Sequence, residues 1–87
     1  AQAGLNQGEA LEAAGDLTGA ARVYLDTFSA APQGPMAAQA LFLVGRSLGR
    51  LGKTQEACVT LGEVPLRFPS AGAAAEAQAA QQQLGCA

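Results

Sequence analysis

The stretch from Leu41 to Pro69 reads LFLVGRSLGRLGKTQEACVTLGEVPLRFP and decides the fold of this chain. Its first part carries large apolar residues at the three- to four-residue spacing of a helix face, and Gly52-Lys53 then breaks the pattern. Its second part resumes the helical spacing and is closed by Pro69. The stretch predicts two helices joined by a tight turn, with Gly45 as a place where a second helix approaches closely.

The same pattern recurs 37 residues earlier, which is the distance from Gly15 to Gly52. The residues that coincide under this shift are Gly8 with Gly45, Leu11 with Leu48, Gly15 with Gly52, Ala20 with Ala57, and Pro32 with Pro69. Self-similarity of this kind is typical of an array of helical hairpins. It predicts a scaffold that binds other molecules.

The spacing of apolar residues, together with the glycines and prolines that interrupt it, predicts five helices. We expect them over about residues 2–14, 18–30, 35–51, 54–64 and 71–84. Thr18 and Ser70 are the expected N-caps of the second and fifth helices. Pro35 is expected in the first turn of the third helix, where a missing amide donor costs nothing.

Two segments near the C-terminus are compatible with more than one structure. Pro65 removes an amide donor inside the fourth helix, which we expect to kink or end between Leu61 and Val64. The final Ala- and Gln-rich segment is either a disordered low-complexity tail or a capping helix. We prefer the cap, because Ala is the best helix former and a stacked array needs a polar-backed end. Its expected packing stripe is Ala73, Ala77, Ala80 and Leu84.

Length and spacing define the predicted domain organisation. We expect one domain over residues 1–87, with repeat 1 at about 1–34, repeat 2 at about 35–69 and the capping helix at about 70–85. The chain begins AQAG, without an initiator Met or a signal core. We therefore expect a processed form or an excised piece of a longer protein.

Composition argues against several functions. Five basic and seven acidic residues give a net charge of −2, which offers no basic face for nucleic acid. No run of 18 or more apolar residues is present, so we expect no membrane insertion. There is no His, no GxSxG turn and no phosphate-binding Gly-rich loop with its Lys. We therefore predict a non-enzymatic chain that needs no cofactor and no metal.

The repeat resembles the tetratricopeptide (TPR) motif. The matching residues are Gly8, Leu11, Ala20, Tyr24 and Pro32 in the first unit, and Gly45, Leu48, Ala57, Leu61 and Pro69 in the second. The chain departs from the motif by lacking the early Trp, by Thr27 where Ala is usual, and by a repeat longer than the usual length of about 34 residues. The resemblance implies an all-α, right-handed superhelix of two helical hairpins plus a C-terminal capping helix.

Two longer phrases, GDLTGAARVYLDTFSAAP and FLVGRSLGRLGKTQEACVTLGEVPLRFPSAGAAAEAQ, carry a closer resemblance. They are similar to the C-terminal TPR domain of the cell division coordinator family of the Tol-Pal system. That family implies a periplasmic protein-binding module, made with a signal peptide, that coordinates outer-membrane constriction with peptidoglycan synthesis during cell division. It implies Tol-system envelope proteins as partners, and oligomerisation of the full-length protein through an N-terminal coiled coil that this chain lacks.

Two alternatives stay open beside this assignment. The first is a TPR scaffold of the outer-membrane β-barrel assembly machinery, whose repeats also end in Tyr/Phe-Pro. The second is a purely structural domain that only associates with itself. Gene neighbours and upstream sequence distinguish these readings, because a signal peptide, a heptad run and a Tol cluster accompany the first family.

The TPR resemblance also implies a partner-binding groove. In a TPR stack the first helix of each hairpin lines the concave surface. The candidate groove residues are Asn6, Glu9, Phe42, Leu43, Arg46 and Arg50. Arg46 and Arg50 would give a cationic patch; the alternative is that all six are ordinary surface residues. Glu9 and Glu12 are interpreted as a solvated helix face.

The two cysteines are the last candidate site. In a TPR stack the second helix of one hairpin packs against the helix that follows it. Cys58 lies early in the fourth helix and Cys86 follows the fifth, so antiparallel packing brings them together. We predict a disulfide between them, which fits an oxidising compartment. The alternative is that Cys58 is a small core residue and Cys86 a free thiol near the terminus.

Overall fold

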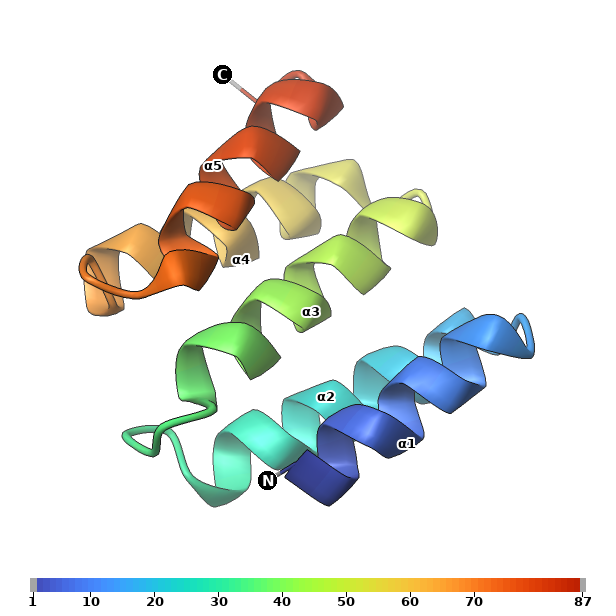
Figure 1. Ribbon diagram of the computed structural model, residues 1–87. Helices are drawn as coiled ribbons and strands as arrows, with labels where there is room; N and C mark the ends of the chain where they lie inside the picture. The colour runs from blue at the N-terminus through green and yellow to red at the C-terminus, as the bar shows by residue number, and fades with distance from the viewer. Residues whose placement is uncertain (1, 87) are drawn as a thin grey trace.

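The computed structural model describes residues 2–86, and within this range the chain forms five α-helices (Figure 1). They are α1 (Gln2–Ala13), α2 (Leu17–Ala30), α3 (Ala37–Arg50), α4 (Thr54–Arg67) and α5 (Gly72–Leu84). Residues 1 and 87 of the predicted domain lie outside the described range. For the described residues the all-α fold is confirmed.

The helices stack in three layers, with α3 in the middle (Figure 1). α1 and α2 form one hairpin and α3 and α4 form the next, while α5 packs against both α3 and α4. The predicted capping helix is therefore present. Ala73 and Ala77 of its packing stripe are buried, and Ala80 and Leu84 are partly buried against the core.

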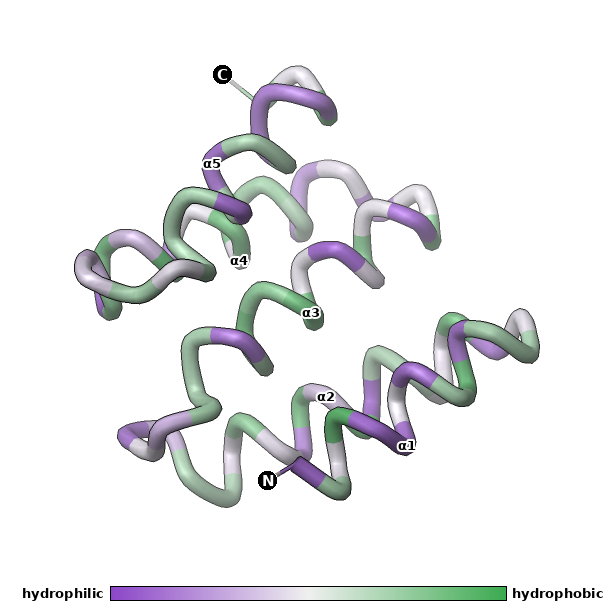
Figure 2. Tube along the Cα trace, in the orientation of Figure 1, coloured by the Kyte–Doolittle hydropathy of each residue, from purple (hydrophilic) through white to green (hydrophobic). Residues whose placement is uncertain are grey.

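α3 supplies the largest part of the core. Its buried residues are Ala37, Ala38, Ala40, Leu41, Phe42, Leu43, Val44, Gly45 and Ser47. In Figure 2 the middle of α3 is drawn as hydrophobic and lies between the outer layers. Apolar residues cover most sides of α3 up to Gly45, so this part of the helix has to be buried, whereas Arg46 and Arg50 give its last turns a polar face that reaches water. This composition explains why α3 is the central helix.

The two hairpins use the same contact at equivalent positions. A Cβ added to Gly8 would overlap the ring of Tyr24, and one added to Gly45 would lie 2.6 Å from Leu61 Cδ2. Both side chains are fully buried. The predicted close approach at Gly45 is confirmed, and in each unit a glycine of the first helix makes room for a large side chain of the second.

The turns inside the hairpins are also equivalent. Gly15 and Gly52 adopt the left-handed conformation, with φ of 88° and 84°. The N–H of the residue after each glycine donates to a carbonyl in the last turn of the preceding helix, Leu11 at 2.8 Å and Leu48 at 3.0 Å. Only glycine adopts this backbone without a steric penalty, so both predicted turns form where the sequence places them.

The expected N-caps were wrong. Asp16, not Thr18, caps α2, and its carboxylate accepts a hydrogen bond of 2.9 Å from the N–H of Gly19. Ala71, not Ser70, precedes α5, and it makes no side-chain capping bond. Asp and Thr are both favoured as N-caps, so the choice between Asp16 and Thr18 depends on the geometry of the preceding turn.

The expected position of Pro35 and the expected early end of α4 were wrong, whereas the alternative expectation of a kink at Pro65 stays a prediction. α3 begins at Ala37, so Pro35 lies in the preceding turn and not in the first turn of the helix. α4 does not end between Leu61 and Val64; it continues through Pro65 to Arg67, and the N–H of Phe68 still donates to the carbonyl of Val64 at 2.8 Å. The lost amide donor costs about 3 kcal/mol or more. Burial of Leu61 and Val64, which lie in the turn before Pro65, offsets that cost.

Candidate functional site

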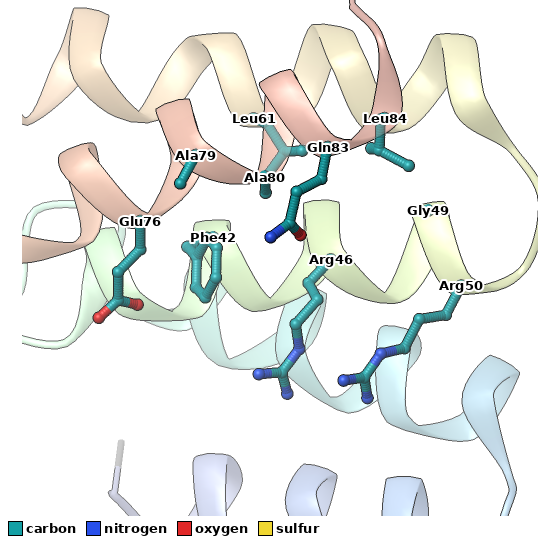
Figure 3. Close-up of a pocket in the computed structure, with 10 residues that line it drawn as sticks. All are labelled: Phe42, Arg46, Gly49, Arg50, Leu61, Glu76, Ala79, Ala80, Gln83 and Leu84. Atoms are coloured by element: carbon teal, nitrogen blue, oxygen red, sulfur yellow. The ribbon is translucent and has the colours of Figure 1, made fainter.

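A groove of about 520 Å³ lies between α3 and α5 (Figure 3). It is lined by Phe42, Arg46, Gly49, Arg50, Leu61, Glu76, Ala79, Ala80, Gln83 and Leu84. The lining residues recur at intervals of three or four residues on both helices, so each helix contributes one continuous face. Leu61 of α4 contributes to the lining from the layer behind.

The structure places three of the predicted groove residues in this lining: Phe42, Arg46 and Arg50. Leu43 is a correction, because it is only 2% exposed and belongs to the core. α3 contacts α2, α4 and α5, so the Leu43 side chain, one position after Phe42, lies among the packed helices. Whether the three lining residues bind a partner stays a prediction.

Asn6 and Glu9 lie elsewhere. Both are exposed on α1, and neither lines the groove. The Asn6 side chain accepts a hydrogen bond of 3.1 Å from the Gln2 amide one turn earlier. The groove thus forms between the first helix of the second hairpin and the capping helix, and the first hairpin contributes no lining residue.

Glu12 is a residue of the candidate site that the sequence interpretation missed. Its side chain is 8% exposed, although we expected a solvated face. Its Oε1 accepts hydrogen bonds from the Tyr24 hydroxyl at 2.5 Å and from Arg46 Nη2 at 2.6 Å, and its Oε2 accepts one from Arg50 Nη1 at 2.8 Å. One carboxylate therefore joins α1, α2 and α3. The arginines follow it by 34 and 38 positions, so no local spacing signalled the contact.

This network shapes the arginine side of the groove. Glu12 neutralises only one of the two positive charges, so the pair keeps a net positive charge. The Arg46 guanidinium also lies 5.9 Å from the centre of the Phe42 ring, within the range of a cation–π contact. Its Nε is buried and has no hydrogen-bond partner among the described residues. The arginines are thus held in place and still able to attract an anionic group.

The hydroxyl of Tyr24 is affected by the same network. Burial, together with the hydrogen bond to Glu12 and the negative charge of that carboxylate, raises the pKa of Tyr24 well above its ordinary value of 10.0. The neutral phenol is therefore favoured in the folded protein. Its proton is lost more readily after unfolding.

Stability is expected to fall as the pH rises above about 10, because the folded state then binds more protons than the unfolded state. Tyr24 is the only tyrosine, so the near-ultraviolet absorbance of tyrosinate reports on it alone. The native chain should ionise at a higher pH than the chain in denaturant. Tyr24→Phe, which lacks the group, should show a flatter alkaline stability profile. Equal titration curves for native and denatured protein would contradict this assignment.

A disulfide between Cys58 and Cys86 ties α5 to α4, as predicted. The Cα atoms are 5.6 Å apart, and the residues are separated by 28 positions. The Gln81 amide adds a hydrogen bond of 3.3 Å to the carbonyl of Cys58. Because Leu84 lies just before Cys86, the cross-link holds the end of α5 that forms part of the groove.

Among residues 2–86, no group of three or more His, Cys, Asp and Glu side chains is placed to hold a metal ion. None of the helices in this range is both long and apolar enough to cross a membrane.

The comparison with known protein families found a match for the second hairpin. Residues 39–71, which hold most of α3 and all of α4, match the family described as tetratricopeptide repeat. No curated protein and no solved structure matches the chain. The match concerns the repeat and carries no link to the Tol-Pal system. With five helices in residues 2–86 and one hairpin that matches this family, the protein has an all-α, TPR-like helical fold.

Proposed function

We propose that the chain is a non-enzymatic protein-binding module that holds a segment of a partner in the groove between α3 and α5. The single observation that carries the proposal is the groove itself, which has an apolar centre and charged groups at its edge. TPR-like stacks present such surfaces to other proteins, because the packed helices keep the lining residues in fixed positions. Binding of this kind needs no cofactor.

We further propose that this binding module works in the cell envelope. The similarity of the two long phrases to the cell division coordinator family supports a periplasmic role within the Tol-Pal system, in which the module coordinates outer-membrane constriction with peptidoglycan synthesis. The disulfide is a second support, since such bonds persist in oxidising compartments. The β-barrel assembly scaffold and the self-associating domain remain the alternatives.

Filling the groove is the test of the binding proposal. Ala79 is exposed on α5 and lines the groove, so Ala79→Trp should block a partner segment and leave the core intact. We expect affinity for the partner captured from an envelope extract to fall at least tenfold, or by about 1.4 kcal/mol. Ala75→Trp is the matched control, because Ala75 is exposed on the same helix and does not line the groove.

Equal capture by both variants would overturn the groove as the binding site, provided that their circular dichroism spectra agree. Charge reversal at both Arg46 and Arg50 is a poorer test. It would bring three carboxylates together around Glu12, so loss of folding and loss of binding would coincide. If the captured proteins include no Tol protein, the Tol-Pal assignment is contradicted and the binding function stands.

A further inference from the structure

The groove has two chemically different ends. Phe42, Arg46 and Arg50 follow one another along α3 at four-residue intervals. In Figure 3, Glu76 of α5 lies at one end of the groove and Phe42 comes next, whereas Arg50 lies toward the other end. A segment that lies along the groove therefore meets a carboxylate at one end and guanidinium groups at the other.

The arginine end carries an excess positive charge. The Glu12 carboxylate bonds to one nitrogen of each arginine and is itself nearly buried. The other guanidinium nitrogens of the more exposed Arg50 remain accessible, since its side chain is 52% exposed. An acidic side chain of a partner can therefore bind at this end without close contact with the carboxylate of Glu12.

The opposite end is negative and the centre is apolar. Glu76 is exposed in the second turn of α5 and forms no salt bridge with any residue in the range 2–86. Between the ends, Phe42 faces Ala79 and Ala80, whose short side chains leave room on the α5 side (Figure 3). A basic side chain of the partner suits the Glu76 end, and a larger apolar side chain of the partner suits the centre.

The length of the groove suits a helix of about two turns. Eight residues separate Glu76 at one end of the groove from Leu84 at the other, which corresponds to about 12 Å along α5. A helix presents side chains on one face at every fourth residue, so three successive positions match the three regions. A partner helix is itself favoured by an acidic residue near its N-terminus and a basic residue near its C-terminus. With its acidic N-terminal end at the arginines and its basic C-terminal end at Glu76, the partner helix runs antiparallel to α3.

We propose that the groove binds an amphipathic helix of a partner protein that carries an acidic, an apolar and a basic residue at successive four-residue intervals, in that order from its N-terminus. The acidic residue contacts Arg46 and Arg50, the apolar residue contacts Phe42 and Ala80, and the basic residue contacts Glu76. This inference rests on the proposed binding function and adds the chemistry of the partner.

Two designed peptides test the charge order. Each has about 15 residues, enough for partial helicity in water, with blocked ends and an Ala- and Gln-rich background. One carries Glu, Leu and Lys at four-residue intervals, and the other exchanges Glu and Lys. We expect the first peptide to bind the intact, oxidised chain about five- to tenfold more tightly, measured by fluorescence anisotropy at low salt.

Variants of the protein assign the preference to the groove. Glu76→Lys makes both ends positive, so the two peptides should bind it about equally. Glu56→Lys is the matched control, because Glu56 is exposed on α4 outside the groove and should keep the preference. A third peptide with Pro in place of a central Ala prevents the helix and should bind at least fivefold more weakly than the first.

The outcomes separate this inference from the proposed function. Equal binding of the two charge-exchanged peptides, or no binding of either, would overturn the inferred partner chemistry. Undiminished binding of the Pro peptide would overturn its helical form. None of these results bears on the partner captured from the envelope extract, which the Ala79→Trp variant tests by itself.

Discussion

Reduction of the Cys58–Cys86 disulfide is expected to lower the free energy of unfolding by about 3–4 kcal/mol. The bond joins residues 28 positions apart, and its loss returns conformational entropy to the unfolded chain. α5 depends on it strongly, because the buried residues of that helix are Ala73, Ala74 and Ala77, which remove little apolar area from water. A domain of this size has a stability of only roughly 5–15 kcal/mol.

Urea unfolding followed by circular dichroism, with and without a thiol reductant, measures the effect. The double variant Cys58→Ser/Cys86→Ser is the control: it should match the reduced protein and should not respond to reductant. A difference below about 1 kcal/mol between the oxidised and reduced chains would contradict the prediction. Because α5 provides one side of the groove, reduction should also weaken partner binding.

Leu61→Ala is expected to destabilise the protein by about 2–5 kcal/mol. Leu61 is fully buried, and its side chain packs on the backbone of Gly45 in α3. Truncation removes apolar contacts and leaves a cavity between α3 and α4. Chemical denaturation gives the change in unfolding free energy, and Val59→Ala on the exposed face of the same helix is the control, with an expected effect within about 0.5 kcal/mol.

The partner glycine provides a sharper version of the same test. Gly45→Ala should cost about 1–3 kcal/mol by overpacking against Leu61, although Ala is the better helix former by about 1 kcal/mol. In the Leu61→Ala background the added methyl group enters vacated space, so the same change should be neutral or stabilising. Additive effects of the two substitutions, within about 0.5 kcal/mol, would show that the contact does not limit the approach of α3 and α4.

Several features could be predicted from the sequence because their causes are local. Gly15 and Gly52 define the turns, since a left-handed residue at a helix end favours glycine wherever the chain goes next. The 37-residue period between them places equivalent packing residues in both hairpins. The disulfide followed from the same regularity, because antiparallel neighbours bring the beginning of one helix beside the end of the other.

Helix ends were less predictable, because several local preferences compete there at similar energies. Asp16 and Thr18 are both good capping residues, and a difference of a few tenths of a kcal/mol decides between them. Pro65 is unfavourable inside a helix when considered alone. Burial of Leu61 and Val64 keeps α4 continuous through it, and that burial exists only in the folded stack.

By itself, the sequence determined that α3 presents Phe42, Arg46 and Arg50 on one face, because helical spacing needs no partner. Only the tertiary structure decided what that face meets. Stacking placed Leu43 in the core, brought Glu12 from α1 to the two arginines, and added the α5 side of the groove. The physical reason is that these contacts join residues tens of positions apart. Their energies depend on burial and charge neighbours that exist only after the helices have packed.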